Sequence, residues 1–221
     1  MYKLISVVML MLMTSLSYAN DIYVTQSGAS LDLDITQDGE NNTVGNSTTA
    51  SASTGATTIL NIDQIGNSNV IKYQINGATY TGVINLVGNS NDVDLNCDST
   101  GGNSSCGSAN AVINFTGNSN DIDLDIGQTS SATSADVDIV GQSGSDSNVV
   151  AATVDGNSAI LTITVNGDTN NYLIDIDGNG DVNGHTLIHT HTGGIADVDI
   201  VQSGTNDNMI TLTTSGDNAD I

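Results

Sequence analysis

Apolar and polar residues alternate along most of the chain. The clearest stretch runs from Leu60 to Gly77, where apolar or amide residues occupy every second position on either side of Gly66. The same frame fits 84–97, 113–126 and 161–176. Strict alternation over about five or six residues, bounded by glycine and asparagine, is typical of half-buried β-strands. The pattern therefore predicts an all-β chain of short strands.

Glycines recur at a nearly constant spacing. Gly55, Gly66, Gly77 and Gly88 lie eleven residues apart, and later glycines keep intervals of eleven or twelve. Fixed periodicity of this kind indicates a repeat architecture. Two strands and two turns make a coil of about 22 residues, and stacked coils let parallel, in-register strands bury a continuous inner column. We predict a single β-solenoid domain over 20–221 with roughly seven coils.

Three segments interrupt this frame. They lie near 43–58, 98–108 and 129–134, are rich in serine, threonine, alanine and glycine, and are predicted to be loop insertions. Cys97 and Cys106 bracket the second one. In an oxidising compartment such a pair forms a disulfide, whereas a metal site needs further ligands and none are adjacent. We predict a Cys97–Cys106 disulfide that closes the loop.

The first residues have the pattern of a targeting signal. A short basic start over 1–3 precedes an apolar run over 4–13, and 17–19 has the small-x-small pattern of a cleavage site. We predict a secretory signal peptide over 1–19, which is too short to span a membrane. The expected product is a secreted chain with no membrane insertion after signal cleavage.

The charge balance restricts the possible partners. The 221 residues include 25 acidic and 2 basic ones, no proline and no tryptophan. Neutralising phosphates requires lysine and arginine, so we expect no nucleic-acid partner. Once Lys3 is removed with the signal, Lys72 is the only basic residue and the net charge is 1 − 25 = −24. Disordered acidic chains are usually rich in proline, lysine and glutamate, so this charge has to belong to a β-rich structure.

A short motif, Gln-x-Gly-x-x-Asn, recurs at the turns. Two copies are complete, two carry one inserted residue before the asparagine, and three keep only Gly-x-x-Asn. The motif residues are Gln37, Gly39, Asn42, Gln64, Gly66, Asn69, Gly88, Asn91, Gly117, Asn120, Gln142, Gly144, Asn148, Gly167, Asn170, Gln202, Gly204 and Asn208. In these residues the chain resembles the curlin family, the subunits of bacterial curli fibres, over nearly all of 20–221. Apolar residues replace several outer amides of the family repeat, so the resemblance is to a divergent member.

The resemblance implies an amyloid-like β-solenoid whose subunits add end to end into extracellular fibres on the bacterial cell surface, for adhesion and biofilm matrix. It also implies ladders of glutamine and asparagine along the stack. The implied partners are further copies of the chain, a curli-type export pore and a nucleator. Independently, alternation reaches 20–24 and 219–221 without a capping segment. Uncapped strand edges recruit further strands, so we expect head-to-tail growth.

Aspartates lie between the apolar positions and are expected to point outward. Adjacent coils lie about 4.8 Å apart, where two carboxylates repel by about 1 kcal/mol in water. Aspartate ladders therefore have to be staggered, screened by salt, or neutralised by cations or low pH, and we expect charge neutralisation to control assembly. A solvated face that keeps the chain soluble and Ca²⁺ bound between coils both remain open.

One stretch has the oxygen spacing of a calcium loop, with Asp175, Asp177, Asn179 and Asp181 as candidate ligands. Thr186 stands where such a loop carries its bidentate glutamate, and a plain turn explains the same residues. No cofactor is required for the predicted fold, and Ca²⁺ is a possible one.

Three histidines, His185, His189 and His191, follow this stretch. Continuing the alternation from Asn183 places His185 and His189 inward, whereas a register change at Ile188 turns them outward. We expect an outward polar strand, with a Zn²⁺ or Cu²⁺ pair at His189 and His191 as the alternative. No nucleophile, base and orienting group share a meaningful spacing, so we do not expect an enzyme.

The leading hypothesis is therefore a fibre subunit. The alternative is a monomeric solenoid: an acidic adhesin, a calcium-binding surface protein or, with less support, an ice-binding one. Ice binding would need regular Thr-x-Thr rows, of which the sequence shows only fragments.

Overall fold

The structure is a computed structural model that describes residues 20–46, 48, 50–97, 106–127, 134–142, 144, 146–177, 184–204 and 208–221. Every regular element in these ranges is a β-strand. Over the same ranges, no helix is long and apolar enough to cross a membrane. The predicted signal peptide over 1–19 lies outside the described residues.

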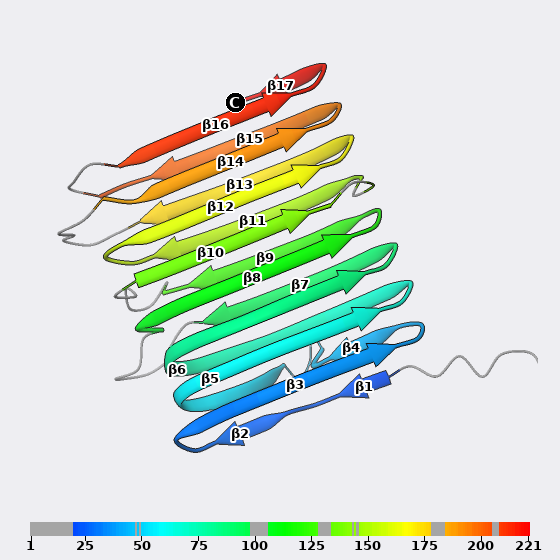
Figure 1. Cartoon of the computed structure of the whole chain (residues 1–221), viewed down its shortest axis with the longest axis vertical. Helices are drawn as coiled ribbons and strands as arrows, with labels where there is room; N and C mark the ends of the chain where they lie inside the picture. The colour runs from blue at the N-terminus through cyan, green and yellow to red at the C-terminus, as the bar shows by residue number, and fades with distance from the viewer. Residues whose placement is uncertain are drawn as a thin grey trace, which may run out of the picture.

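The strands stack into a β-solenoid of about seven turns, which confirms the predicted fold class. Figure 1 shows the coils piled along the long axis. Their bounds are β1 Asn20–Ile22, β2 Thr25–Ser27, β3 Ser30–Asp38, β4 Asn42–Val44, β5 Ser51–Ile65, β6 Ser68–Val87, β7 Ser90–Cys97, β8 Ser108–Thr116, β9 Asn120–Ile126, β10 Ser134–Gly141, β11 Asn148–Asp155, β12 Ala159–Asn166, β13 Thr169–Asp177, β14 Thr186–Thr192, β15 Ile195–Gln202, β16 Met209–Ser215 and β17 Asn218–Asp220.

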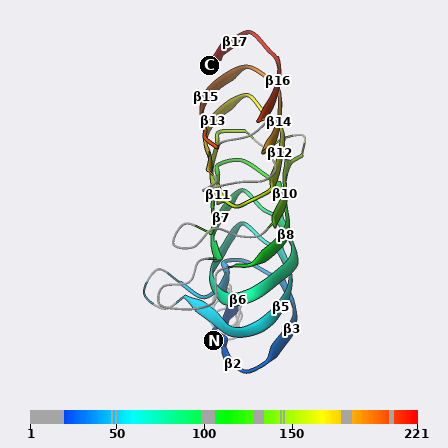
Figure 2. The ribbon, with the colours of Figure 1, turned by 90° about the vertical axis from the view of Figure 1, so that its left-hand side faces the viewer.

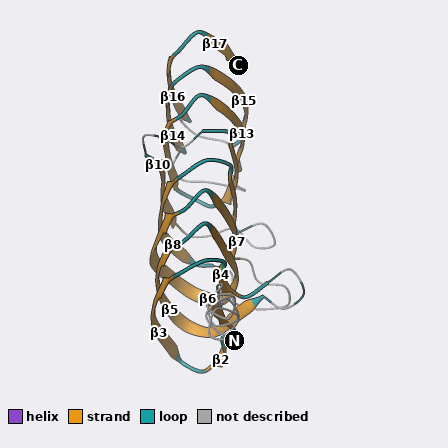
Figure 3. Cartoon of the chain, turned by 90° about the vertical axis from the view of Figure 1, so that its right-hand side faces the viewer, coloured by secondary structure: helices purple, strands orange, loops and turns teal. Residues whose placement is uncertain are grey.

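Each coil contributes one strand to each of two faces, and all the pairings within a face are parallel. Face I contains β3, 57–65 of β5, 79–87 of β6, β8, β10, β12, β14 and β16. Face II contains β1, β2, β4, 51–55 of β5, 68–76 of β6, β7, β9, β11, β13, β15 and β17. The two faces form the opposite walls of a flattened coil (Figure 2, Figure 3).

The coils differ in length. Asn69 and Asn91 occupy the same place in successive coils and are 22 residues apart, as the glycine spacing predicts. Asn91 and Asn120 are 29 residues apart, because an insertion lies between them. The stack tolerates these insertions because they leave the coil at its turns, where no ladder hydrogen bond is lost.

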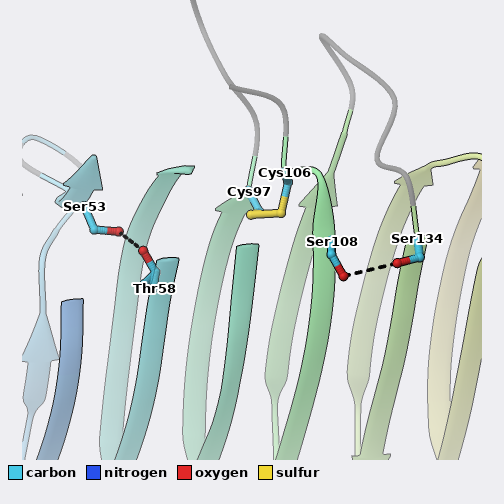
Figure 4. Close-up of a disulfide and its surroundings, with 6 residues drawn as sticks. All are labelled: Ser53, Thr58, Cys97, Cys106, Ser108 and Ser134. Carbon is cyan, nitrogen blue, oxygen red and sulfur yellow. Dashed lines mark hydrogen bonds between the residues drawn. A yellow bond between two sulfur atoms is a disulfide. The ribbon is translucent and has the colours of Figure 1, made fainter. Parts of the chain in front are cut away.

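The predicted loop near 43–58 is wrong over its second half. β5 begins at Ser51, and Ser51 and Ser53 pair in register with Tyr73 and Ile75. Ser51, Ser53 and Thr58 are buried, and the Ser53 and Thr58 hydroxyls hydrogen-bond at 3.0 Å (Figure 4). Because these inward positions carry small hydroxyl side chains, the strand has the composition of a loop.

Inward side chains form straight rows that run along the solenoid. One row on face I consists of isoleucines from six successive coils: Ile35, Ile62, Ile84, Ile113, Ile139 and Ile163. All six are buried. Burying one such side chain contributes about 1.5–3 kcal/mol, so stacked rows replace the bulky aromatic core that the composition lacks.

The predicted disulfide is present. Cys97 ends β7 and is bonded to Cys106, which lies just before β8, with a Cα–Cα distance of 5.6 Å (Figure 4). Both cysteines are buried. The bond therefore joins the end of β7 to the start of the segment that leads into β8.

Candidate functional site

A ladder of asparagine side chains runs along face II beside one turn of the coil. The amide Nδ2 of each residue donates to Oδ1 of the next: Asn20 to Asn42 at 3.1 Å, Asn42 to Asn69 at 3.0 Å, Asn69 to Asn91 at 2.8 Å, Asn91 to Asn120 at 2.5 Å, Asn120 to Asn148 at 2.6 Å and Asn148 to Asn170 at 2.6 Å. The six motif asparagines of this ladder therefore lie together, as predicted, and are buried.

The ladder also holds the turns. Asn42 Nδ2 donates to the Ile65 carbonyl at 2.9 Å, and Asn170 Nδ2 donates to the Gly167 carbonyl at 2.8 Å. A buried amide without partners costs about 1–3 kcal/mol, and these contacts remove that cost. The alternating pattern predicts Asn20 in a strand, but the repeat motif does not include it in the ladder. Its inward position, two residues before Ile22, was the available signal.

The glutamine row is much shorter than the motif predicts. Gln64 Nε2 donates to Gln37 Oε1 at 2.7 Å, but the row continues as Leu86 and then Phe115. Gln142 is exposed, because Gly141 takes the inward place beside Phe115. A Cβ at Gly141 would lie 2.6 Å from Phe115 Cζ, so the glycine makes room for the ring.

The last predicted motif copy belongs to the other turn of the coil. Gln202 pairs in register with Ile176 on face II, and its Nε2 donates to the His185 carbonyl at 3.3 Å. Asn208 is exposed and accepts from the His185 amide at 3.0 Å. Gln202, Gly204 and Asn208 therefore do not extend the asparagine ladder. An eleven-residue glycine spacing marks both turns alike, which is why the sequence could not separate them.

The motif glycines permit close stacking of the turns. A Cβ at Gly66 would lie against the carbonyl oxygen of Gly39, and one at Gly88 against that of Gly66. Gly117 has φ +132°, a conformation that side chains disfavour. Gly144 has φ +86° with open space around it. At Gly144 the backbone angle, and not a close neighbour, is what requires glycine.

The ladder ends in a cluster of buried polar rings. Asn170 Nδ2 lies 3.2 Å from His191 Nδ1, and the Tyr172 hydroxyl lies 3.1 Å from the same nitrogen. The Tyr172 and His189 rings meet edge to face at 4.3 Å. All three histidines are buried, so the expectation of an outward strand is wrong. Leu187 of β14 points inward beside Leu161 of β12, and His189 and His191 follow at alternate positions in the same register.

Burial perturbs the ionisation of this cluster. Desolvation, with a smaller contribution from neighbouring His191, lowers the pKa of His189 from 6.5 to about 4. Desolvation also lowers the pKa of His191 and raises that of the Tyr172 hydroxyl. At neutral pH the cluster is therefore uncharged, and it can charge only at a cost to folding.

The aspartates of the described strands point outward as predicted, and on face I they are staggered. Asp34 pairs with Asn61 and Asp63 with Asn85, and each asparagine Nδ2 donates to its aspartate, at 2.8 and 2.6 Å. Among the described face I residues, no aspartate pairs in register with another. At Asp34 and Asp63, hydrogen bonding to a neutral asparagine thus takes the place of repulsion between carboxylates.

Aspartates stack on one another on face II. Asp92 pairs with Asp121 and Asp94 with Asp123. Lys72 lies over them, with Nζ 2.5 Å from Asp92 Oδ1 and 3.9 Å from Asp94 Oδ2. Desolvation, followed by repulsion from Asp94 and Asp121, raises the pKa of Asp123, and Lys72 opposes the shift. Lys72 is therefore placed where carboxylates stack.

The candidate calcium ligands are only partly described. Asp175 and Asp177 lie on the outward side of β13, and Ser203 Oγ donates to Asp177. Asn179 and Asp181 lie outside the described residues. Within the described ranges, no group of three or more histidine, cysteine or acidic residues is placed to hold a metal ion.

Both ends of the stack expose strand edges. In the part of the chain that the structure describes, β3 pairs only with β5, and β16 only with β14. A hollow of about 520 Å³ opens at one end between Asn20–Ile22 and Thr36–Asp38. Another of about 430 Å³ lies at the opposite end between Ile195–Asp197 and Asn218–Asp220. The inner rows therefore reach the surface at both ends.

Compared with protein-family models, curated proteins and solved structures, the chain matches none of them.

Proposed function

We propose that this chain is a secreted structural subunit that assembles head to tail into curli-like extracellular amyloid fibres. The observation that carries the proposal is a pair of strand edges, on β3 and β16, that have no partner within the described residues and on which straight inner rows end. Unpaired parallel edges offer a full set of backbone donors and acceptors to another strand. A second copy supplies the same geometry, because every coil repeats it.

The end coils also expose apolar side chains that further stacking would bury. Ile210, on the inward side of β16, is 48% exposed, although Leu187 in the same row one coil inward is fully buried. At the other end, Leu31 and Leu33 of β3 are only partly buried against the core. Burying this surface at about 25 cal/mol per Å² favours addition of a copy at either end.

The charge of the chain opposes the same process. Stacked aspartates on face II bring repulsion into every fibre, and this repulsion weakens with salt or acid. Fibre growth is therefore expected to accelerate as carboxylates are screened or protonated. This control suits a subunit that has to stay soluble until it is exported.

The curli-like character of the fibre rests on the asparagine ladder and its glycine turns. On this proposal the chain is exported through a curli-type pore, joins a nucleator at the surface of a bacterial cell, and contributes to adhesion and biofilm matrix. Ca²⁺ bridging between aspartates belongs to the same proposal as an accessory ion.

The test is growth of fibres by the mature chain, residues 20–221, followed by thioflavin fluorescence and negative-stain microscopy. Ile210→Lys places an ammonium group in an inner row at the β16 edge and should abolish growth from that end. Met209→Lys adds the same charge one position away on the outward side, and should not. A mature chain that stays monomeric at high concentration for days would refute the proposal.

One observation favours a second candidate, ice binding. The outward residues of β12, β14 and β16 are uncharged, and Thr164, Thr190 and Thr213 stack in register. The structure thus joins threonine pairs that look scattered in the sequence, on strands about 4.8 Å apart. Thermal hysteresis lost in Thr190→Lys but kept in Thr153→Lys, on face II, would support it. Its absence in the unmodified chain would exclude it.

A further inference from the structure

The strand β17 covers only part of the edge beneath it. Asn218–Asp220 pair with Ile195–Asp197 of β15. Among the described residues, Val198–Gln202 of β15 have no partner on that side. All three β17 residues are exposed.

The first strands of the chain match the whole of that edge. β1 and β2 lie on face II in the columns that β15 occupies at the other end. The column of Gln26 runs through Ser53 to Ile75 and then, one position past the registered pair Gln74–Asn96, through Cys97, Ile126, Val154 and Ile176 to Gln202. The column of Asn20 runs through the asparagine ladder to Ala196. Residues 20–27 of a second copy therefore fit 196–203.

A second copy cannot pair along both faces of this end while β17 stays in place. If β3 of a second copy pairs with β16, its preceding strands fall on β15, and Asn20 and Asp21 take the places of Ala219 and Asp220. If instead β1 stacks on top of β17, face I is left one strand short at the junction. One of the two short strands has to leave before both faces can pair.

The geometry points to β17 as a detachable cap on the β16 end of the stack, an inference that rests on the proposed fibre function. Its seat on β15 is the seat of β1 and β2 from a second copy of this chain. Assembly is then a strand exchange in which a three-residue pairing gives way to one of about eight residues.

Side-chain contacts show why β17 and not β1 leaves. Asn20 of β1 donates to Asn42 Oδ1 at 3.1 Å and to the Asp38 carbonyl at 3.4 Å, and Gln37 donates to its carbonyl. The equivalent residue of β17 is Ala219, which has no amide to offer. Backbone bonds, such as Asn218 N to the Gly194 carbonyl at 3.2 Å, hold the strand.

The exchanged junction is complementary on face II. It stacks Ile22 on Val198 and Gln26 on Gln202, so an apolar row and an amide row continue across it. Amide side chains stacked on one another hydrogen-bond along the stack, as they do in cross-β structures. Asp21 on Asp197 is the one repulsive pair.

Face I is complementary in charge. Its inward pairs include Leu33 on Ile210 and Ile35 on Leu212. The acidic outward residues of β3 fall on neutral partners: Asp32 on Met209, Asp34 on Thr211 and Asp38 on Ser215. In the interior coils of face I, each aspartate likewise lies beside an uncharged residue. A second copy of this chain is therefore the occupant that fits this edge.

Removing the cap tests the inference directly. The mature chain shortened to end at Gly216 lacks β17 and should show a shorter lag and faster elongation than the full mature chain. The shortened chain also loses Asp217 and Asp220, so the control is full-length Asp217→Asn/Asp220→Asn, which keeps the cap and should not reproduce the acceleration. Equal rates for the shortened and full mature chains would overturn the inference.

A reversible lock tests it from the other side. Asp197 and Asp220 are registered neighbours on the outward side, and strands about 4.8 Å apart fall within disulfide range. Asp197→Cys/Asp220→Cys should lose growth at the β16 end when oxidised and regain it with a thiol reductant. Thr81→Cys/Asn110→Cys, another registered outward pair on interior strands, should grow in both states.

The outcomes separate this inference from the function on which it rests. Unmodified chain is followed with and without reductant, because the native disulfide is also reduced. If the locked chain grows as fast as the control pair, the cap is wrong while the fibre stands. If no variant grows, the unmodified chain included, the proposed function fails and the cap fails with it.

Discussion

Replacing His189 by isoleucine should remove an acid-sensitive weak point from the core. His189 occupies the next place after Ile163 in the row of six buried isoleucines, with Leu212 following it. It is fully buried, and within the described residues neither ring nitrogen has a hydrogen-bond partner. His189→Ile continues the row with a side chain of similar size and no polar atoms.

The size of the effect follows from the ionisation of the ring. Burial lowers the pKa of His189 from 6.5 to about 4. One pKa unit corresponds to about 1.4 kcal/mol, so the shift is equivalent to about 3 kcal/mol. Burying ring nitrogens without partners adds on the order of 1–3 kcal/mol at every pH. The variant should therefore be more stable at neutral pH, and more so in acid.

The free energy of unfolding depends on pH in a direction that is set by whether the folded or the unfolded chain binds the proton more readily. Above pH 6.5 the ring is neutral in both states and contributes no pH dependence. As the pH falls toward 4, the unfolded chain binds a proton that the folded chain does not, so the free energy of unfolding falls. His191, with its lowered pKa, acts in the same direction. Asp123, with its raised pKa, acts in the opposite one, because its protonation in acid relieves repulsion in the folded chain.

Thermal unfolding of the monomer at pH 7, 5 and 4, followed by circular dichroism, measures the difference. For a chain of this length about 3 kcal/mol corresponds to roughly 6–12 °C in Tm. The gap between variant and unmodified chain should widen by that amount from pH 7 to pH 4. Thr190→Ile, on the outward side next to His189, is the control and should leave the pH dependence unchanged. A gap independent of pH would refute the assigned burial.

Three further changes probe the rows and the turns. Asn120→Ala leaves Asn91 and Asn148 without their ladder partner and should lower the free energy of unfolding by about 2–4 kcal/mol in denaturant titration, whereas a similar loss for exposed Asn110→Ala would count against the ladder. Cys97→Ala/Cys106→Ala should cost about 3 kcal/mol from loop closure, and an unchanged Tm would contradict this. Gly141→Ala pushes a methyl group against the Phe115 ring and should cost about 1–3 kcal/mol; a neutral result would mean that the ring can move aside.

The sequence alone determines which side is buried in strands whose inward positions are apolar or amide residues; β14, which carries histidines there, is the exception. Side chains alternate strictly along a strand, so the inward place of Ile62, the outward place of Asp34 and the turn at Gly66 all follow from local pattern. The asparagine ladder is predictable for the same reason, because Asn69 and Asn91 keep one frame relative to their glycines. The disulfide follows from two cysteines flanking a loop.

Only the tertiary structure decides which residues of successive coils become neighbours in the stack. Alternation tells whether a side chain points inward or outward, but not which residue of the next coil it lies against. Insertions change the coil length from 22 residues between Asn69 and Asn91 to 29 residues between Asn91 and Asn120. Stacking therefore reveals that aspartates are paired on face II and staggered on face I, and that Gln202 lies at the opposite turn from Gln64. It also holds His189 inward, because the parallel ladder on both sides of β14 outweighs the polarity of one ring.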